Sequence, residues 1–558
     1  MNGLPNNITD AHEEITSLRG KVDSLRRLAN QLEEALRLAR ANRFGNSSEK
    51  LDDNQASLFD EAELEALVDG DENNETTGNV VSISGHTRNR GLRKPLPANL
   101  PRVRVEHTLD ASELVTPDGK VFVKIGESTS EQLAVIPASV YVIQHVRFKY
   151  AVPNFGEHGV KIAPINNQTI PKSMASASLL AHIAQSKYDY HLPLYRQERY
   201  WHSLGIDINR TSMARWLVEL GSLISPLTEL ILKTIKKHPV INVDETRVTV
   251  VNDKHKKPDK ASHGGWMWAY TNAKGIFYEY THSRQGLHAV NRLRDFTGHV
   301  QKDGFSGYDQ LFDPKKYQSN LIDQYPKIQV GCMAHARRKF MDVIKATKLT
   351  KANATDEASI ISKLSLSNSQ AAFFIKEFAK LYKVEKDLKK DGYSTDNLED
   401  EFHIHETRQA QSKPILDNIK VRMDNLDGQA LPKSTLGMAL TYLRNNWASL
   451  IEYINCGLIE IDNNRAERAI KPFVIGRKNW LFSQATKGAE ASANLLTLIE
   501  NAKHHDLNVL NYLQYVFENI RSALSLKDPE ALVVLLPSEV AKANILDKHN
   551  TNQFKKSA

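Results

Sequence analysis

The sequence has 558 residues, of which 25% are charged and 41% are hydrophobic, and its net charge is +7. This length predicts several domains with a substantial core, and the small basic surplus favours a polyanionic partner only weakly. Two cysteines are too few for a disulfide scaffold, no apolar run is long enough to span a membrane, and the polar N-terminus predicts no signal peptide.

Residues 1–45 are predicted to form a coiled-coil helix. Apolar or small residues recur at alternating spacings of three and four from Ile15 to Ala39, with charged residues beside them, and Gly45 and Asn46 end the pattern. A seam this narrow favours self-association through a coiled coil. The alternative is a single amphipathic helix that docks on its own protein.

Residues 46–100 are predicted to form a flexible linker that is first acidic and then basic. The stretch 51–75 carries acids and no base, whereas 86–104 carries bases and no acid. Such composition is typical of solvated, mobile chain. The functional alternative is a basic segment that follows a DNA backbone through Arg88, Arg90, Arg93 and Lys94.

Residues 171–235 are predicted to form a helix-turn-helix that binds DNA, after a β-rich module at 101–170 that contains short strand-like runs. Gly205 interrupts the helical pattern as a helix stop, and Asn209 or Thr211 can cap the next helix. Ordinary helical packing produces the same pattern. In a DNA-binding motif, the side chains that project from the start of the second helix toward bases or phosphates would be Arg210, Thr211, Ser212 and Arg215.

Two aspartates follow strand-like runs in the next part of the chain. Asp244 closes the β-branched run 239–243, so we expect it at the exit of a buried strand. Asp303 follows the short run 298–302 and precedes two glycines, which indicates a strand that opens into a turn. The two carboxylates could therefore lie side by side.

A third acid lies on a predicted helix at 460–476. Asn463, Glu467 and Lys471 are spaced at i, i+4 and i+8, so they share one face. Phosphodiester chemistry uses two divalent cations about 3.5–4 Å apart, and carboxylate oxygens bind such cations while leaving positions for water and phosphate. Any one acid alone would be expected to face water. Together, the three acids suggest an enzyme that cuts and joins DNA with two Mg²⁺ ions, for which Mn²⁺ can substitute.

These segments, together with 331–340 and 476–482, resemble the transposase (TnpC) of the insertion sequence 66 family. The resemblance begins near residue 43 and extends to about residue 520. It implies a DDE-type recombinase with an RNase H-like core, whose catalytic and metal-binding triad is Asp244, Asp303 and Glu467. The last two acids are 467 − 303 = 164 residues apart. Because this gap is too long for a simple core, an insertion must fill it.

The expected fold class is multidomain α+β. The α/β catalytic core is predicted in two parts, 236–344 and 456–505, because strand-like and short helical runs alternate between 239 and 335. Residues 345–455 have apolar positions at helical spacing and predict an all-helical insertion before the last catalytic acid. A C-terminal helical segment and tail occupy 506–558.

Members of the resembled family usually carry a zinc ribbon with two cysteine pairs in the region 101–170. This chain has no cysteine there, and Val152 and Phe155 take the places of the second pair. Because thiolates are missing, we expect a degenerate ribbon and no structural zinc.

Four residues are predicted to support the active site: Cys332, His335, Asn463 and Asn464. The pair Cys332 and His335 offers only two ligands, so a packed cysteine and a hydrogen-bonded histidine are the alternative to a metal site. Several basic residues lie close to these motifs and suit phosphate binding. They are Arg337, Arg338, Lys339, Arg465, Arg468, Lys471, Arg477 and Lys478.

The resemblance thus implies a transposase that binds the terminal inverted repeats of its element, cleaves a strand and joins the 3′-OH to target DNA. A catalytically silent DNA-binding regulator and an RNase H-like nuclease are the alternatives. Self-association through the coiled coil and small accessory proteins of the same element are expected, and a membrane partner is not. The expected location is cytoplasmic, in the bacterial cytosol or nucleoid.

Overall fold

The computed structural model describes residue 18 and residues 140–151, 160–162, 168–312, 326–346, 370–526, 528 and 530–546. Apart from Leu18, the predicted coiled coil and the predicted linker lie outside these residues. Among the helices that are described, none is both long and apolar enough to cross a membrane. The chain divides into two units, of which the smaller is Asp71–Ile165.

The described part of the smaller unit is an antiparallel pair of short strands and the extended segment 140–148 that precedes it. Strand β1 (Lys149–Ala151) pairs with β2 (Val160–Ile162), and Lys149 lies opposite Ile162. Large apolar side chains that precede this pair, such as Val142 and Phe148, are exposed. Within its described residues this unit therefore has no buried core.

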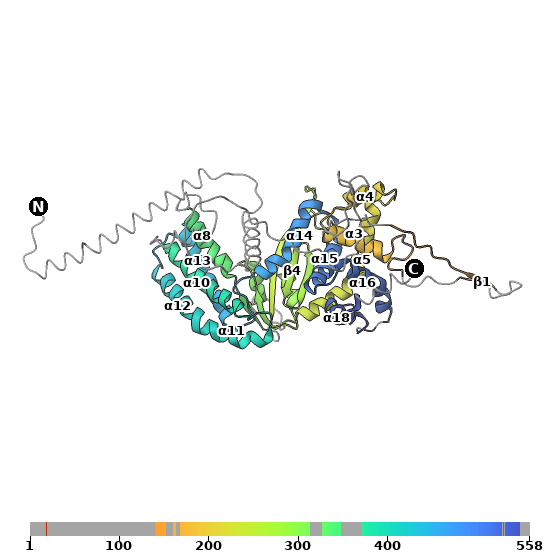
Figure 1. Ribbon diagram of the computed structural model, residues 1–558. Coiled ribbons are helices and arrows are strands. Elements are labelled where there is room, and N and C mark those ends of the chain that lie inside the picture. Colours follow the sequence, from red (N-terminus) through yellow and green to blue (C-terminus); the bar gives the residue numbers. More distant parts are fainter. Residues whose placement is uncertain are drawn as a thin grey trace, which may run out of the picture. The chain divides into compact units, whose positions relative to one another are not determined.

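A six-stranded sheet lies at the centre of the larger unit (Figure 1). Strands β3 (Val240–Asn252), β4 (His263–Asn272) and β5 (Gly275–Thr281) are antiparallel. Strands β6 (Gly298–Gln301) and β7 (Lys327–Val330) continue the sheet on the other side of β3 and run parallel to it. A short strand, β8 (Ser483–Ala485), pairs with the far end of β3. The order β5-β4-β3-β6-β7 makes β3 the central strand.

Strand β3 is longer than predicted, so the expectation that Asp244 lies at its exit is wrong. The strand continues to Asn252, and Asp244 pairs with Ala269 of β4. The extension follows from alternation, because Val248 and Val250 are buried while Arg247 is exposed. On the other side, pairing with β6 stops at Asn242. Asp244 therefore lies just beyond the point where β3 and β6 separate.

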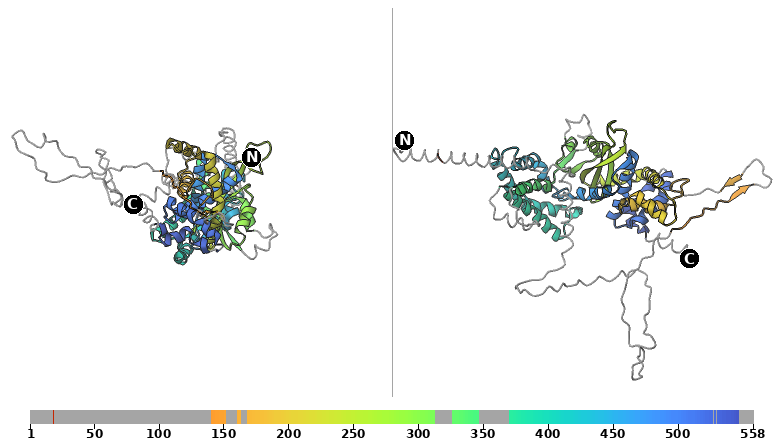
Figure 2. Two further views of the ribbon diagram at one scale, coloured as in Figure 1. Left: turned by 90° about the vertical axis from the view of Figure 1, so that its right-hand side faces the viewer. Right: turned by 90° about the horizontal axis from the view of Figure 1, so that it is seen from above.

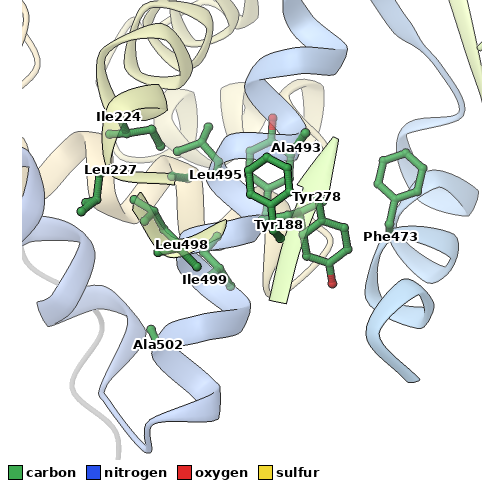
Figure 3. Packing of buried hydrophobic residues seen from close by; sticks show 14 of the residues in the cluster. Tyr188, Ile224, Leu227, Tyr278, Phe473, Ala493, Leu495, Leu498, Ile499 and Ala502 are labelled. Carbon is green, nitrogen blue, oxygen red and sulfur yellow. The ribbon is translucent and has the colours of Figure 1, made fainter. Parts of the chain in front are cut away.

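Four long helices pack with the sheet into the larger hydrophobic core: α3 (Ala177–Tyr188), α5 (Arg210–Ile235), α15 (Thr486–His504) and α16 (Val509–Ser525). Figure 3 shows Leu495, Leu498 and Ile499 of α15 next to Ile224 and Leu227 of α5. The apolar residues of α15 recur at helical spacing, so one helix can bury a continuous stripe against its neighbours. Through this core, α5 and α15 pack against β5, at one edge of the sheet.

Helices α5 and α15 approach so closely at Gly221 that we expect Gly221→Val to destabilise the protein. A Cβ atom at residue 221 would lie 2.4 Å from the Cα and Cβ atoms of Ala491. Because the two packed helices cannot separate without opening the core, we expect the free energy of unfolding to fall by about 1–3 kcal/mol. Thermal unfolding followed by circular dichroism should show a lower midpoint. The matched control is Ser222→Val, at the exposed neighbouring position, and an equal loss in both variants would contradict the packing argument.

A second hydrophobic core lies on the β7 side of the sheet and is built almost entirely from helices. These are α8 (Met333–Ala346), α10 (Gln370–Lys390), α12 (Lys413–Asn425) and α13 (Thr435–Ile451). Helix α11 (Glu401–Thr407) instead contributes Ile404 to a small separate cluster with Val384 and Leu388 of α10. Figures 1 and 2 both show this helical group and the α3, α5 and α15 group on opposite sides of the sheet. Every regular element described between 370 and 455 is helical, as the sequence pattern indicates.

The remaining elements are short, except α14 (Asn464–Trp480), which packs against β3 and β4. The other described elements are α4 (Leu194–Ser203), α6 (Leu287–Leu293), η1 (Ser306–Leu311), η2 (Leu398–Asp400), the π-helical turn η3 (Arg408–Ser412), η4 (Glu452–Asn455), α17 (Glu530–Val533) and α18 (Pro537–Lys542). The prediction of a chain that mixes helices and sheet is confirmed.

Candidate active site

Three different elements carry the predicted acids. Asp244 lies on β3, beyond the end of its pairing with β6. Asp303 lies in the turn after β6, where its carboxylate accepts a hydrogen bond of 3.0 Å from the backbone N–H of Phe305. Glu467 lies in the first turn of α14 and is buried. Strand, turn and helix thus bring together acids that are far apart in the sequence.

The electrostatics of Asp244 indicate that these acids affect one another. Burial raises the pKa of Asp244 well above its ordinary value, and the negative charges of Glu245, Asp303 and Glu467 raise it further. Crowded carboxylates that are shielded from water cost free energy unless a proton or a cation neutralises them. Their oxygens are hard ligands, so the donor set fits a divalent cation such as Mg²⁺.

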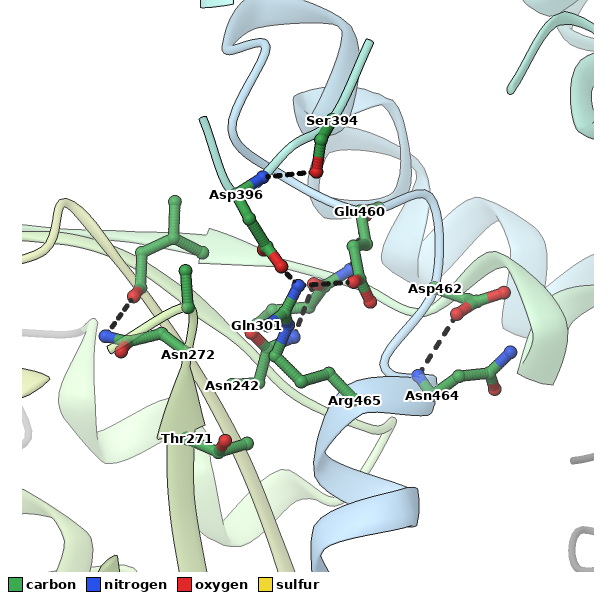
Figure 4. A network of polar contacts seen from close by, with 12 residues as sticks. Asn242, Thr271, Asn272, Gln301, Ser394, Asp396, Glu460, Asp462, Asn464 and Arg465 are labelled. Atoms are coloured by element: carbon green, nitrogen blue, oxygen red, sulfur yellow. Dashed lines mark hydrogen bonds and ion pairs between the residues drawn. The ribbon is translucent and has the colours of Figure 1, made fainter. Parts of the chain in front are cut away.

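A buried amide network attaches the start of α14 to the sheet, and Figure 4 shows part of it. The side-chain N–H₂ of Asn242 donates to the Oε1 atom of Gln301 at 2.8 Å and to the Oδ1 atom of Asn463 at 3.1 Å. In return, the Nδ2 atom of Asn463 donates to the carbonyl of Val243 at 3.0 Å. Asn463 is the N-cap residue of α14, not a member of the predicted helical face. Its amide sets the position of the helix that carries Glu467.

The neighbouring Asn464 begins the helix itself. Its backbone N–H donates to the carboxylate of Asp462 at 3.1 Å (Figure 4). This contact belongs to the turn that leads into α14, so it supports the same helix start as Asn463.

Glu245 is a buried acid that the sequence analysis did not single out. The Nε atom of Arg284 donates to one of its carboxylate oxygens at 2.6 Å, and the hydroxyl of Tyr308 donates to the other. Burial raises the pKa of Glu245 to about 7, and the charge of Asp303 adds to this effect, although Arg284 and Tyr308 oppose it. Arg284 also lies over the ring of Phe305, 3.7 Å from its centroid. Glu245 therefore links β3 to the segment that follows β5 and to η1, which follows Asp303.

Cys332 and His335 lie where β7 leads into α8, and the fold brings both close to Glu467. The Sγ atom of Cys332 accepts a hydrogen bond of 3.2 Å from the backbone N–H of Asn463. The Nδ1 atom of His335 lies 3.9 Å from the Oε1 atom of Glu467. Burial lowers the pKa of His335 to about 4, and the charges of Arg338 and Lys339 also lower it. A neutral imidazole can accept a hydrogen bond or bind a metal.

The helical insertion also reaches this region through Tyr442 of α13. A Cβ atom added to Gly304, next to Asp303, would lie 2.8 Å from the Tyr442 ring. Burial raises the pKa of the Tyr442 hydroxyl, and the nearby Cys332 and Asp303 add to the effect. The sequence gives no sign of this contact, because Tyr442 lies 442 − 304 = 138 residues from Gly304.

Several of the predicted DNA-binding residues make contacts within the protein. Arg465 forms ion pairs with Asp396 and with Glu460, the latter at 2.7 Å (Figure 4). Arg477 donates to the hydroxyl of Thr246 at 2.9 Å and to a backbone carbonyl of β3. Their guanidinium groups thus tie α14 to the insertion and to the sheet. The other bases around the acids are exposed or half-buried: Arg337, Arg338, Lys339, Arg468, Lys471 and Lys478.

Helices α4 and α5 are joined by a short turn of the predicted kind. Gly205 adopts a positive φ of 75° just after α4, a conformation that favours glycine. The side chain of Asn209 caps α5 by accepting the N–H of Ser212 at 2.8 Å. At the start of α5, Met213 and Trp216 are buried. The side chains of Arg210, Thr211 and Arg215 are exposed there, and Ser212 is half-buried.

Comparison with known families gives three matches along the chain. Residues 172–491 match the Transposase IS66 family. Residues 31–105 match the family described as Transposase C of IS166 homeodomain. Residues 117–151 match the zinc-finger binding domain of transposase IS66. The first match spans more than half of the chain and includes all three acids.

Two relatives from Sinorhizobium fredii match over nearly the whole length. The uncharacterized protein y4jD is 28% identical, with 93% of this chain and 94% of the relative covered. The uncharacterized protein y4qI is 30% identical, with 94% and 92% covered. Among solved structures, the Mos1 transposase paired-end complex with left transposon end is 11% identical, with 39% of this chain and 80% of that chain covered. Its TM-score of 0.12 is too low to support a shared fold.

The expectation that the chain has no structural zinc is wrong. The match of residues 117–151 to a zinc-finger family points to a zinc-binding element in this region. The expectation assumed that thiolates are required, whereas zinc also binds imidazole nitrogen and carboxylate oxygen. The matched stretch contains no cysteine, and it contains His145 and several acids.

Proposed function

The chain belongs to the IS66 family of transposases, and on this premise we propose that it cleaves and joins DNA at a DDE active site formed by Asp244, Asp303 and Glu467. The observation that carries the proposal is that a strand, a turn and a helix bring the three acids near one another: burial raises the pKa of Asp244, and the charges of Asp303 and Glu467 raise it further. Three acids from a strand, a turn and a helix make a metal site that no single segment could form.

The topology of the sheet supports an RNase H-like core. The antiparallel strands β4 and β5 lie on one side of the central strand β3, and β6 and β7, which run parallel to β3, lie on the other. The first acid lies on the central strand and the second follows the adjacent parallel strand. The helices between 370 and 455 separate these elements from α14, which carries the third acid. This arrangement fits a DDE core with a helical insertion.

The proposed chemistry proceeds in two displacements at phosphorus. Water attacks the phosphate at an element end, and the 3′ oxygen leaves as a free 3′-OH. That hydroxyl then attacks a phosphate of the target, so one P–O bond forms and one breaks in each step, without ATP or a covalent protein intermediate. Bound divalent cations would activate the attacking oxygen and stabilise the leaving one. The protein contributes the three carboxylates, held in place by Asn463 and by the contacts of Glu245.

We assign DNA binding to two groups of polar and basic residues. Arg210, Thr211 and Arg215 are exposed at the start of α5, the position from which a helix-turn-helix contacts a groove. Arg337, Arg338 and Lys339 on α8, with Arg468, Lys471 and Lys478 on α14, suit phosphate contacts near the acids. We omit Arg465, whose guanidinium group forms ion pairs with two acids, and Arg477, which donates to β3.

We further propose that the protein acts as a homo-oligomer, since two element ends must be held together during joining. The coiled-coil pattern at 1–45 is the sequence feature that supports self-association. Small accessory proteins of the same element are additional proposed partners.

Metal dependence provides the test of this function. Purified full-length protein is incubated with labelled duplex that carries candidate terminal repeats and with a supercoiled target, in Mg²⁺, in Mn²⁺ or in EDTA. We expect nicking and joining with either cation and no product in EDTA, because carboxylates alone cannot stabilise the phosphorane charge. Specific binding without cleavage would favour the silent regulator. Cleavage of an RNA·DNA hybrid without joining would favour the nuclease.

A further inference from the structure

Three chemically different metal ligands converge beside the proposed active site. The Sγ atom of Cys332, a ring nitrogen of His335 and a carboxylate oxygen of Glu467 all lie within 4.8 Å of one another. The first two come from the junction of β7 and α8, and the third comes from α14. The Cys-x-x-His spacing alone offers only two ligands, so the third becomes visible only in the folded protein.

This ligand set suits a different cation from Mg²⁺. Mg²⁺ selects oxygen ligands in octahedral geometry, whereas a thiolate and an imidazole select zinc and similar metals. Zinc–ligand distances of about 2.0–2.3 Å in a tetrahedron place the ligand atoms roughly 3.3–3.7 Å apart. The 3.9 Å between His335 Nδ1 and Glu467 Oε1 is close to that value. Small side-chain rotations would therefore complete the site.

We propose that Cys332, His335 and Glu467 form a Zn²⁺ site with an open fourth position, and that zinc there inhibits the enzyme. The inhibitory part rests on the proposed function, because Glu467 would be shared with the Mg²⁺-binding acids. On this proposal, zinc binding draws the Glu467 carboxylate away from the other two acids, so zinc occupancy and strand cleavage exclude one another.

The local structure holds the cysteine in place and leaves part of the histidine ring exposed. Cys332 is only 1% exposed, and its sulfur already accepts the N–H of Asn463, a donor that also favours a thiolate. The His335 side chain is 23% exposed, while its Nδ1 atom, which faces Glu467, is buried. Burial raises the pKa of the Cys332 thiol, and zinc binding would displace its proton.

Cobalt(II) is the probe that tests the site independently of activity. Thiolate ligation gives Co²⁺ a charge-transfer absorption in the near ultraviolet, and the chain contains only two cysteines. We expect the full-length protein, without DNA, to show this absorption. Cys332→Ser should abolish it, and the matched control Cys456→Ser, at the other buried cysteine, should retain it. Zn²⁺ should displace the cobalt, whereas millimolar Mg²⁺ should not.

Two more variants keep the test decisive if Cys332→Ser fails to fold by circular dichroism. His335→Asn and Glu467→Gln each remove one ligand and should weaken Co²⁺ binding at least tenfold. Absence of the absorption in the unmodified chain, its survival in Cys332→Ser, or unchanged affinity in both other variants would overturn the site.

A separate experiment tests whether zinc inhibits the enzyme. One equivalent of Zn²⁺ added before Mg²⁺ should reduce cleavage by the unmodified protein at least tenfold, and a zinc-selective chelator should restore it. Zinc binding without inhibition would overturn this part of the proposal. A protein that binds Co²⁺ through Cys332 but never cleaves DNA in Mg²⁺ would instead contradict the proposed function and leave the metal site standing.

Discussion

Asp244→Asn is expected to reduce both strand cleavage and strand joining by about 10³-fold or more while DNA binding is retained. The substitution keeps the shape of the side chain but removes one negative charge from the proposed cation site. A loss of about 4 kcal/mol in transition-state stabilisation corresponds to this factor. The measurement is the rate of nicking and of joining on labelled element ends, with binding followed separately by gel shift.

The same substitution should not destabilise the protein in the absence of metal. Burial and neighbouring acids raise the pKa of Asp244 in the folded state, so its ionised form costs stability at neutral pH. An asparagine removes that cost, and the thermal midpoint in EDTA should be unchanged or higher. Asp295→Asn is the matched control, because Asp295 is largely exposed and pairs with Lys236. Equal activity of the two variants would contradict the role of Asp244.

Arg408→Met is expected to destabilise the helical insertion by about 3–5 kcal/mol. Arg408 is fully buried at the π-helical turn. It forms a bidentate ion pair with Glu385, with distances of 2.9 and 2.6 Å, and donates to the carbonyls of Tyr453 and Cys456. Methionine fills similar volume but leaves a largely buried carboxylate and two carbonyls without their donor. The measurement is amide hydrogen exchange in α10 to α13, which should become faster as the local stability falls.

Two comparisons separate this effect from a general cost of removing charge. Lys420→Met breaks the exposed pair with Asp424, and such a pair contributes only about 0.3–0.5 kcal/mol. Arg408→Met combined with Glu385→Leu removes both charges and should be less destabilising than Arg408→Met alone. If the double variant instead loses as much free energy of unfolding as the two single variants lose together, the buried ion pair is not the cause of the destabilisation.

The predicted strands and short helices of the core are present in the structure. Strands β4, β5 and β7 lie within the region 239–335, where strand-like and short helical runs are predicted to alternate, because β-branched and aromatic residues concentrate in these strands. Alternation after Asp244 also extends β3, a signal that the prediction overlooked by ending the strand at the acid. The local sequence pattern was therefore sufficient to predict which segments form strands and helices. The position of Asp244 within its strand could be seen only from the pairing of β3 with its neighbours.

The surroundings of the acids depend on contacts that no local pattern encodes. Glu245 is buried because Arg284 and Tyr308 reach it from other elements. Tyr442 comes from the insertion, and Asn463 bonds across to β3. Similarly, charge clustering around Glu467 predicted DNA contacts for Arg465, whereas its partners Asp396 and Glu460 become evident only in three dimensions. Only the folded structure reveals contacts between side chains that are far apart in the sequence.

The most direct measurement for the proposed active site is the location of bound manganese in crystals of the full-length protein. An anomalous difference map would be calculated from crystals grown with Mn²⁺, which has the same ligand preferences as Mg²⁺. We predict peaks between the carboxylates of Asp244, Asp303 and Glu467, and their loss in Asp244→Asn crystals. Well-ordered carboxylates without a peak between them, at a Mn²⁺ concentration that supports cleavage, would contradict the assignment of these acids as the metal-binding triad.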